Sequence, residues 1–451
     1  MKKSTAHKLT ELLIAFSLLA VLFGKIFINL KDNEFNLLIF YGISVTFAVW
    51  LVFFFAFLVY KDPYVVSAMK LKKKKVHEDY FVSCMVAVHN EEKNITQCVD
   101  SILSQSYINK EVIVVNDAST DNTLRILKKY EKKQLIKLID LKENLGKKKA
   151  LSRAMEIAKG DIFAFTDSDS MWAPDAIEKI ATIFQANKDV GAVSGHCRAL
   201  NGDENLITRI QDSWYEGQYS VRKAFESIWG AVTCVSGPLA VFRKEAIFNY
   251  IPAWENDTFL GREFRFATDR TLTGFVLGSS SIGEKLKKKW KDSPFVKLYD
   301  YPAQDWKILY CKSARSWTIV PNTFQKVLRQ QVRWKKSFIR NLFFTGLFYW
   351  RRPFLPVLLY YLHIFFVMAG PFIVFRHLVY LPMNGNSWTA LLYLCGIVFV
   401  GFMFGLAYKL ENKSSHKWIY RPLMSLLSTL VLSWLIFYSA ATIKKMIWTR
   451  G

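Results

Sequence analysis

Two aspartates, one residue apart, are the side chains of this sequence best suited to chemistry. Asp167 and Asp169 follow the apolar run 162–166, which predicts a buried β-strand. Side chains alternate along an extended chain, so we expect both carboxylates to point the same way. Two such charges repel each other unless a cation lies between them, and Mg²⁺ or Mn²⁺ prefers these ligands and can bring a diphosphate. The alternative is a turn that caps a helix at 174–186.

Three further positions carry groups that could bind or activate a substrate. Asp117 ends a second strand-like run, where its carboxylate could accept a hydrogen bond from a uracil N–H or a ribose hydroxyl. The alternative is that Asp117 caps the next helix. Lys147 opens a run of three lysines at the start of a predicted helix, where positive charge opposes the helix dipole. A bound diphosphate would offset this charge; the alternative is that the lysines form a solvated basic face. Asp269 precedes Arg270, which keeps it ionised, so it is a candidate general base or an N-cap.

A third group of residues lies in the stretch 322–350, which alternates basic and bulky apolar side chains. This pattern predicts an amphipathic helix at a membrane surface. Gln330, Arg333 and Trp334 lie three and four positions apart and should share one face. An arginine can clamp a diphosphate and a tryptophan can stack on a sugar ring. A basic surface helix with one Trp anchor is the alternative.

The elements that must position these residues follow a repeated strand–helix order. This order predicts an α/β domain with a mostly parallel sheet, in which ligands bind at the carboxyl ends of the strands. The expected strands cover 81–88, 111–115, 135–141 and 162–166, and the expected helices cover 94–105, 120–132 and 147–158.

Apolar residues gather at both ends of the 451-residue chain, while basic clusters flank the apolar runs. With a net charge of +24, this distribution favours a membrane surface over nucleic acid. The candidate membrane spans are 9–30, 35–60, 354–381, 388–410 and 423–442. The expected division is 1–75 for two spans and a basic linker, 76–317 for the cytosolic domain, 318–352 for the interface helices and 353–451 for the C-terminal membrane region.

The charges near the C-terminus conflict with three full crossings after the interface helix. Three crossings would put residues 444–451 outside, whereas Lys444, Lys445 and Arg450 favour the inside. We therefore expect one of the three segments to be re-entrant or interfacial. The six cysteines show no metal-ligand spacing, which predicts free thiols.

Five motifs occur in the order typical of the processive family-2 glycosyltransferases, which include cellulose, chitin and hyaluronan synthases. They are Asn90-Glu91-Glu92, Asp117, Asp167-Ser168-Asp169, Thr268-Asp269-Arg270 and Gln330-x-x-Arg333-Trp334. The chain most resembles the hyaluronan synthases, over residues 80–345 and the flanking spans. It departs from them at Ala267-Thr268-Asp269-Arg270, where the family has Gly-Asp-Asp-Arg, and in a lysine-rich insertion at 279–305.

The resemblance implies a glycosyltransferase-A-type cytosolic domain embedded between transmembrane and interfacial helices in the cell membrane. It implies UDP-sugars (UDP-GlcNAc and UDP-GlcA), Mg²⁺ or Mn²⁺, a growing polysaccharide and membrane lipids as partners. By this resemblance, Asp269 would be the catalytic base, and Asp167 and Asp169 would bind the metal. The nucleotide sugar would be bound by Glu91, Asp117, Lys147, Asp167 and Arg333. The acceptor would be bound by Trp334, Gln330, Ser236 and Gly237, and the residues implied in gating are Trp448 and Arg450.

The resemblance leaves other products and another enzyme class open. A chitin-like or poly-GlcNAc glycan and a glucose–glucuronate capsule are the alternative polymers. A non-processive transferase that acts on a lipid-linked sugar is the alternative enzyme. A transporter or scaffold without enzymatic activity would leave the three carboxylates Asp167, Asp169 and Asp269 without a role.

Overall fold

The computed structural model describes residues 37–74 and 79–445, together with parts of 9–26. The expected first span at 9–30 is therefore described only in part. The end of the chain at 446–451, with Trp448 and Arg450, lies outside the described residues.

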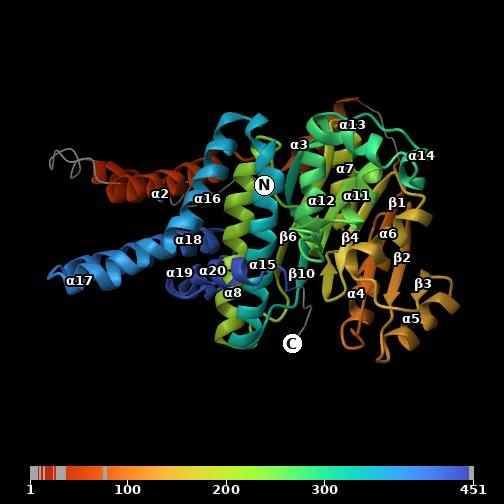
Figure 1. Cartoon of the computed structure of the whole chain (residues 1–451). Coiled ribbons are helices and arrows are strands. Elements are labelled where there is room, and N and C mark those ends of the chain that lie inside the picture. The colour runs from red at the N-terminus through yellow and green to blue at the C-terminus, as the bar shows by residue number, and fades with distance from the viewer. Residues whose placement is uncertain are drawn as a thin grey trace.

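An eight-stranded sheet forms the centre of the α/β domain, in the order β3-β2-β1-β4-β7-β6-β10-β5 (Figure 1). Strands β3, β2, β1 and β4 are parallel neighbours, as are β6 and β10, while β7 and β5 run antiparallel to their neighbours. The mostly parallel sheet predicted from the strand–helix order is thus confirmed. Its strands are β1 Val82–Val88, β2 Lys110–Asp117, β3 Lys137–Leu141, β4 Ile162–Asp167, β5 Ser170–Trp172, β6 Val190–Ala199, β7 Ala240–Arg243 and β10 Lys307–Thr318.

Alternation along the strands gives the sheet two apolar faces, each with its own core. Along β2, Val112 and Val114 belong to one core, whereas Ile113 and Val115 belong to the other. Helices α4, α5 and α7 contribute to the first core and α6 to the second, so the sheet is covered on both faces. These helices are α4 Ile95–Leu103, α5 Thr123–Lys132, α6 Lys147–Ile157 and α7 Ala176–Ala186.

A second group of helices lies between the sheet and the apolar helices (Figure 1). Helix α8 (Leu206–Gly217) runs on into the π-helix η2 (Gln218–Lys223) and α9 (Ala224–Ile228). Helix α15 (Phe324–Phe344) begins after Thr323, whose side chain accepts from the Lys326 N–H. It is the helix expected within 322–350. The remaining elements of the domain are η3 Gly237–Leu239, α10 Lys244–Ile247, η4 Phe248–Tyr250, α11 Ile251–Glu255, β8 Thr258–Phe259, β9 Arg262–Glu263, α12 Thr268–Leu277, α13 Ser279–Lys289 and α14 Pro294–Lys297.

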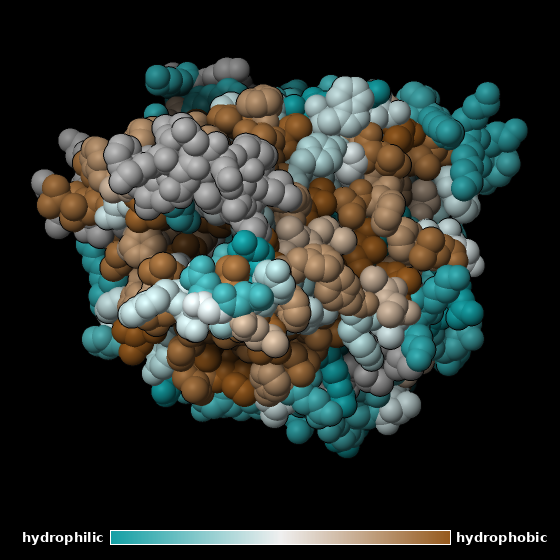
Figure 2. Space-filling model, turned by 60° about the vertical axis from the view of Figure 1, so that its left-hand side comes forward, coloured by the Kyte–Doolittle hydropathy of each residue, from teal (hydrophilic) through white to brown (hydrophobic). Residues whose placement is uncertain are grey.

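Among the described residues, three helices are long and apolar enough to cross a membrane: Tyr41–Lys73, Phe354–Met383 and Trp388–Glu411. They extend from one side of the domain, and that side carries large apolar areas with hydrophilic residues at its rim (Figures 1 and 2). The elements involved are α2 Leu37–Phe54, η1 Phe55–Val59, α3 Pro63–Lys74, η5 Thr345–Leu347, η6 Tyr349–Arg351, α16 Phe354–Phe375, η7 Arg376–Tyr380, α17 Leu381–Met383 and α18 Trp388–Glu411.

The segment expected to span at 423–442 is not one straight helix. Its two parts, Lys417–Leu430 and Leu432–Ala441, are bent by 41° (η8 Lys417–Tyr420, α19 Arg421–Leu430, η9 Leu432–Trp434, α20 Leu435–Ala441). After this bend the chain returns to the domain, where Ile443 packs against Phe264 and Phe266. The Lys336 Nζ also donates to the carbonyl of Lys445, at 2.8 Å. The described end of the chain therefore packs against the α/β domain and α15.

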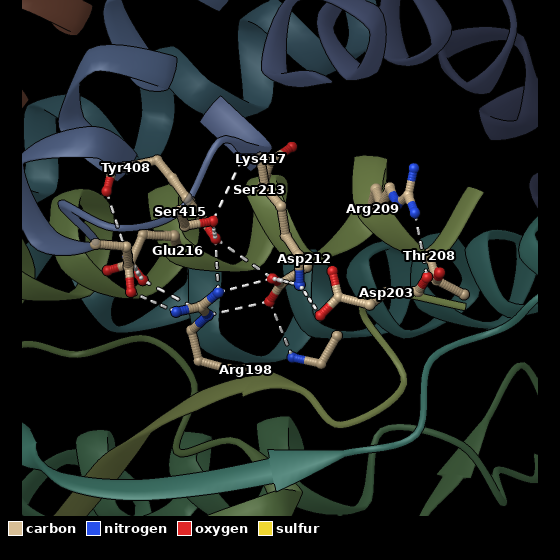
Figure 3. Close-up of polar contacts among 12 residues, drawn as sticks. Arg198, Asp203, Thr208, Arg209, Asp212, Ser213, Glu216, Tyr408, Ser415 and Lys417 are labelled. Carbon is tan, nitrogen blue, oxygen red and sulfur yellow. Dashed lines mark hydrogen bonds and ion pairs between the residues drawn. The ribbon is translucent and has the colours of Figure 1, made fainter. Parts of the chain in front are cut away.

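A buried ion network joins the domain to α18 and η8 (Figure 3). The Arg198 Nη2 of β6 lies 2.6 Å from the Asp212 Oδ2 of α8 and donates to the Tyr408 Oη of α18 at 2.7 Å. Lys417 Nζ contacts the same Asp212 oxygen at 3.1 Å. Burial alone would raise the pKa of Asp212, but Arg198 and Lys417 outweigh it and lower that pKa. Each charge in this network is needed to compensate another.

The lysine-rich insertion is folded onto the domain. Ser279, at the start of α13, shares a 2.8 Å hydrogen bond between its Oγ and the Tyr250 Oη. Phe295 of α14 is buried against Phe248, with ring centroids 5.1 Å apart. All six cysteines are free thiols, as their spacing predicted.

Candidate active site

Strand β4 ends at Asp167, and the residues Ser168 and Asp169 form the turn that leads into β5. The extended conformation expected through Asp169 is therefore wrong, and a turn separates the two carboxylates. The turn considered as the alternative is thus present, but it does not cap α7, which is preceded by Asp175. The two carboxylates still interact: burial and then the charge of Asp167 raise the pKa of Asp169 to about 6.

Lys147 lies directly against this carboxylate pair. Its Nζ contacts the Asp167 Oδ1, and the charges of Asp167, Asp269 and Asp169 outweigh burial and raise its pKa. The loop before it is held by Asp117, which accepts from the N–H groups of Leu145 (2.7 Å) and Gly146 (2.9 Å). Asp117 thus positions the start of α6 and does not cap α5, which is preceded by Asn122.

The lysines after Lys147 do not form a solvated face. Lys148 is buried, with its Nζ 2.8 Å from the Asp257 Oδ2 and 2.8 Å from the carbonyl of Phe264. Burial lowers its pKa to about 8 in spite of Asp257. Arg340 of α15 contacts the same carboxylate. Asp257 therefore ties α6 to α15.

The carboxylate pair fits a divalent cation that takes its other ligands from a substrate. No group of three or more His, Cys, Asp or Glu side chains suited to a metal occurs within the described residues. Mg²⁺ is commonly held by one or two carboxylates plus phosphate oxygens and water. The pKa of Asp169 stays raised even with Lys147 beside the pair, and a divalent ion would supply further positive charge. Asp167 and Asp169 are the residues that would hold it.

Asp269 lies in the first turn of α12, whose N-cap is Ala267, so the N-cap role considered for Asp269 is wrong. Its Oδ2 accepts from the backbone N–H of Gly237 at 3.2 Å. A Cβ on Gly237 would lie 2.7 Å from the Asp167 Oδ2. Gly237 is therefore the point where the candidate base and the donor-side carboxylate approach each other, and the site leaves no room for a side chain there.

The structure adds Lys223, which the sequence patterns missed. Its Nζ donates to the hydroxyls of Ser236 (2.5 Å) and Ser194 (2.8 Å) and lies 4.2 Å from the Tyr219 ring centroid. Burial lowers its pKa, although Asp269 is close enough to oppose that effect. Lys223 belongs to no motif, and its only signal is a charge that precedes the apolar pair Ala224-Phe225.

Gln330, Arg333 and Trp334, expected to share one face of α15, have different surroundings in the structure. Arg333 points toward the carboxylates: burial lowers its pKa and the charge of Asp169 opposes this. Trp334 instead faces α8, with its ring 5.6 Å from Trp214 and 6.5 Å from Tyr215. The Gln330 Oε1 is buried without a hydrogen-bond partner among the described residues. An acceptor hydroxyl could satisfy that oxygen.

Glu91 lies at the same strand edge but makes mainly local contacts. Its Oε2 accepts from Asn94 at 2.8 Å, and its N–H donates to the Thr123 Oγ1 at 2.9 Å. These bonds link the end of β1 to the start of α5, so the described contacts of Glu91 shape the edge of the site.

The arrangement of donor-side carboxylates, a lysine and a separate base suits the transfer of a group from a diphosphate. Residues 83–250 match the family model of glycosyl transferase family 2. The α/β domain that contains this match is a family-2 glycosyltransferase domain. This glycosyltransferase is 26% identical over 388 residues to the hyaluronan synthase of Streptococcus pyogenes, covering 83% of this chain and 84% of that protein.

Further comparisons relate the glycosyltransferase to enzymes with other products. It is 28% identical over 304 residues to the poly-beta-1,6-N-acetyl-D-glucosamine synthase of Staphylococcus epidermidis, covering 67% of this chain and 65% of that one. Among solved structures it is similar to a mannosyltransferase of Pyrobaculum calidifontis in complex with GDP-Man and Mn²⁺, with a TM-score of 0.48 and 18% identity, over 96% of this chain and 99% of that chain. The glycosyltransferase is related to synthases of more than one polymer.

Proposed function

We propose that this glycosyltransferase is a membrane-embedded, processive and inverting enzyme that makes hyaluronan from UDP-GlcNAc and UDP-GlcA. One observation carries the proposal: Asp167 and Asp269 meet at Gly237, with Lys147 on Asp167 and Arg333 within the field of Asp169. The hyaluronan synthase relative also supports it, because the match covers more of both chains than that to the poly-N-acetylglucosamine synthase.

In the proposed reaction, Lys147 and Arg333 bind the diphosphate of the donor. Asp167 and Asp169 would hold the Mg²⁺ or Mn²⁺, which would supply further positive charge to the leaving UDP when bound. Asp269 takes the proton of an acceptor hydroxyl, whose oxygen forms a bond to the anomeric carbon while the bond from that carbon to the UDP oxygen breaks. Attack on the side opposite to the UDP inverts the configuration at this carbon.

The acceptor binds on the other side of Gly237. Trp334, which is 37% exposed, offers a ring face beside Trp214. Ser236, which accepts from Lys223, and the Gln330 Oε1, unsatisfied among the described residues, supply further polar groups for the acceptor. Stacking holds the terminal sugar of the polymer while its hydroxyl remains free for Asp269.

We also propose the division into membrane, catalytic and interface regions given above. In this topology α16 and α18 cross the membrane, while the bent pair formed by α19 and α20 does not. The contact of Lys445 with Lys336 supports a cytosolic end. Trp448 is three residues further on, about 10 Å along an extended chain at most, which supports its role in gating the site.

The product is tested with the purified full-length chain in nanodiscs with Mg²⁺ or Mn²⁺, given single or paired UDP-sugars. We expect sustained UDP release only with UDP-GlcNAc and UDP-GlcA together, and a polymer that hyaluronidase degrades. Sustained release with UDP-GlcNAc alone and a chitinase-sensitive or poly-N-acetylglucosamine product would replace the proposal with its alternative, which the second relative supports.

A further inference from the structure

The seam between α15 and α16 carries an excess of positive charge beside the acceptor site. Arg222 of η2, Arg270 of α12 and Lys335 of α15 surround His363 of α16, close enough for their charges to act on its ring. Arg222 and Arg270 act in the same way on Tyr360, one turn earlier on α16. These three cations come from three different parts of the sequence, so only the tertiary structure brings them together.

The carboxylate that contacts Arg222 is already occupied. Glu226 contacts Arg222 at 3.3 Å and accepts from both the N–H and the hydroxyl of Thr233, each at 3.0 Å. Arg222 additionally lies 3.3 Å from the His363 Nε2. In the described part of the chain, the side chains of Arg270 and Lys335 make no hydrogen bond or ion pair. Two cations of the cluster therefore lack an anionic partner.

Lys335 is half-buried. Burial lowers its pKa to about 8, the effect expected for an ammonium group withdrawn from water without a counter-charge. Lys335 and Phe338 share a helix face, and the Phe338 ring packs against His363 with centroids 5.9 Å apart. By contrast, Arg329 of the same helix is exposed.

Three consecutive residues of α15 thus face three different surroundings. Arg333 faces the donor carboxylates, Trp334 faces the aromatic rings of α8, and Lys335 faces α16, the helix that we propose enters the membrane. A chain that passes from the acceptor platform toward α16 meets Lys335 next. A neutral glycan would leave its charge uncompensated, whereas a carboxylate would compensate it.

We propose that Lys335, together with Arg270, binds the carboxylate of a uronic acid unit in the growing chain on the membrane side of the acceptor platform. The site deepens the proposed function and rests on it, because it requires a polymer that contains uronate. It makes Lys335 a residue that favours acidic over neutral glycans, and that retains the polymer between successive additions.

The test compares Lys335→Met, which removes the charge, with Lys335→Arg, which keeps it, and with Arg329→Gln as a control on the exposed face. Binding of a hyaluronan tetrasaccharide and of neutral chitotetraose is measured on the purified full-length protein. We expect the wild type to prefer the acidic probe about tenfold, equivalent to about 1.4 kcal/mol. This preference should be lost in Lys335→Met and kept in Lys335→Arg and Arg329→Gln. Raised salt should reduce it.

With both donors present, Lys335→Met should shorten the polymer several-fold and leave the KM for each UDP-sugar unchanged. An unaltered preference and polymer length in Lys335→Met overturns the carboxylate site. If Lys335→Met shortens the polymer only in anionic lipid and still prefers the acidic tetrasaccharide, Lys335 binds lipid headgroups. This result also overturns the carboxylate site. If the wild type makes no uronate polymer when both UDP-sugars are supplied, the result overturns the proposed function itself and is distinguishable from a failure of the carboxylate site.

Discussion

The backbone N–H of Gly237 donates to the Asp269 carboxylate at 3.2 Å, while its Cα faces the carboxylate of Asp167. A single glycine therefore separates the candidate base from the donor-side acid. The spacing of these two functional groups depends on the absence of a side chain at this position.

Gly237→Ala should lower kcat about a hundredfold, since a displacement of the reacting groups by about 1 Å has an effect of that size. The added Cβ would lie 2.7 Å from the Asp167 Oδ2, so the carboxylate must move. UDP release and UDP affinity are measured on the same preparation. Gly396→Ala in α18 is the matched control, because nothing lies within 4 Å of its Cβ. Equal kcat values for the two variants would contradict the spacing argument.

Asp269→Asn should reduce sugar transfer about a thousandfold and leave UDP binding unchanged, because the amide cannot accept the proton of the acceptor hydroxyl. Initial rates and UDP titrations check the two parts separately. Asp292→Asn, at a side chain that is 82% exposed, should retain normal rates. Wild-type turnover in Asp269→Asn would assign the base to another residue.

Asp169→Asn should abolish turnover through loss of the divalent ion, since it removes one of the two carboxylates that would hold that ion. Rates are measured across a titration of Mn²⁺ after treatment with a chelator. The wild type should regain activity on addition of metal and the variant should not. Normal rates with an unchanged metal dependence in Asp169→Asn would refute the assignment.

Trp334→Ala and Trp214→Ala should each shorten the polymer by about tenfold, because their rings lie 5.6 Å apart and form one platform. The double variant should be little worse than either single variant, as expected for residues in contact. Polymer length and UDP affinity are determined together, and the affinity should not change. Trp350→Ala, at a side chain that is 58% exposed, serves as the control. Additive losses would indicate that the two rings act independently.

Asp212→Asn should lower the melting temperature of the detergent-solubilised protein by several degrees, because Arg198 and Lys417 would lose their buried partner at a cost of about 3 kcal/mol. Asp203→Asn should have little effect, since Asp203 contacts the same lysine but is 82% exposed.

The same network gives a pH dependence of stability. The folded-state pKa of Asp212 lies below its usual value, so its contribution is present above the unfolded-state pKa and is lost as the pH falls through the folded-state pKa. Acid should therefore destabilise the wild type in this range more than Asp212→Asn. Parallel melting curves against pH would contradict the buried ion network.

The strand–helix order, the apolar ends and the motif order could be read from the sequence alone. Alternation and helical periodicity are local consequences of backbone geometry, so β1 to β4 and α4 to α6 lie within a few residues of their predicted bounds. The basic residues at 444 and 445 likewise predict a cytosolic end, because the positive-inside tendency is a property of local composition, and this remains a prediction.

Other features depend on contacts between residues far apart in the chain, and only the tertiary structure decided them. Gly237 meets Asp167 and Asp269, Lys223 joins Ser194 to Ser236, and Lys335 faces His363. No local pattern encodes these pairs, since packing sets the direction and burial of each side chain. The sequence by itself determined which chemical groups are present and the elements that carry them. The packing of the sheet against α8, α12 and α15 decided which of those groups meet, because burial sets the pKa of each group and distance sets the partners it can contact.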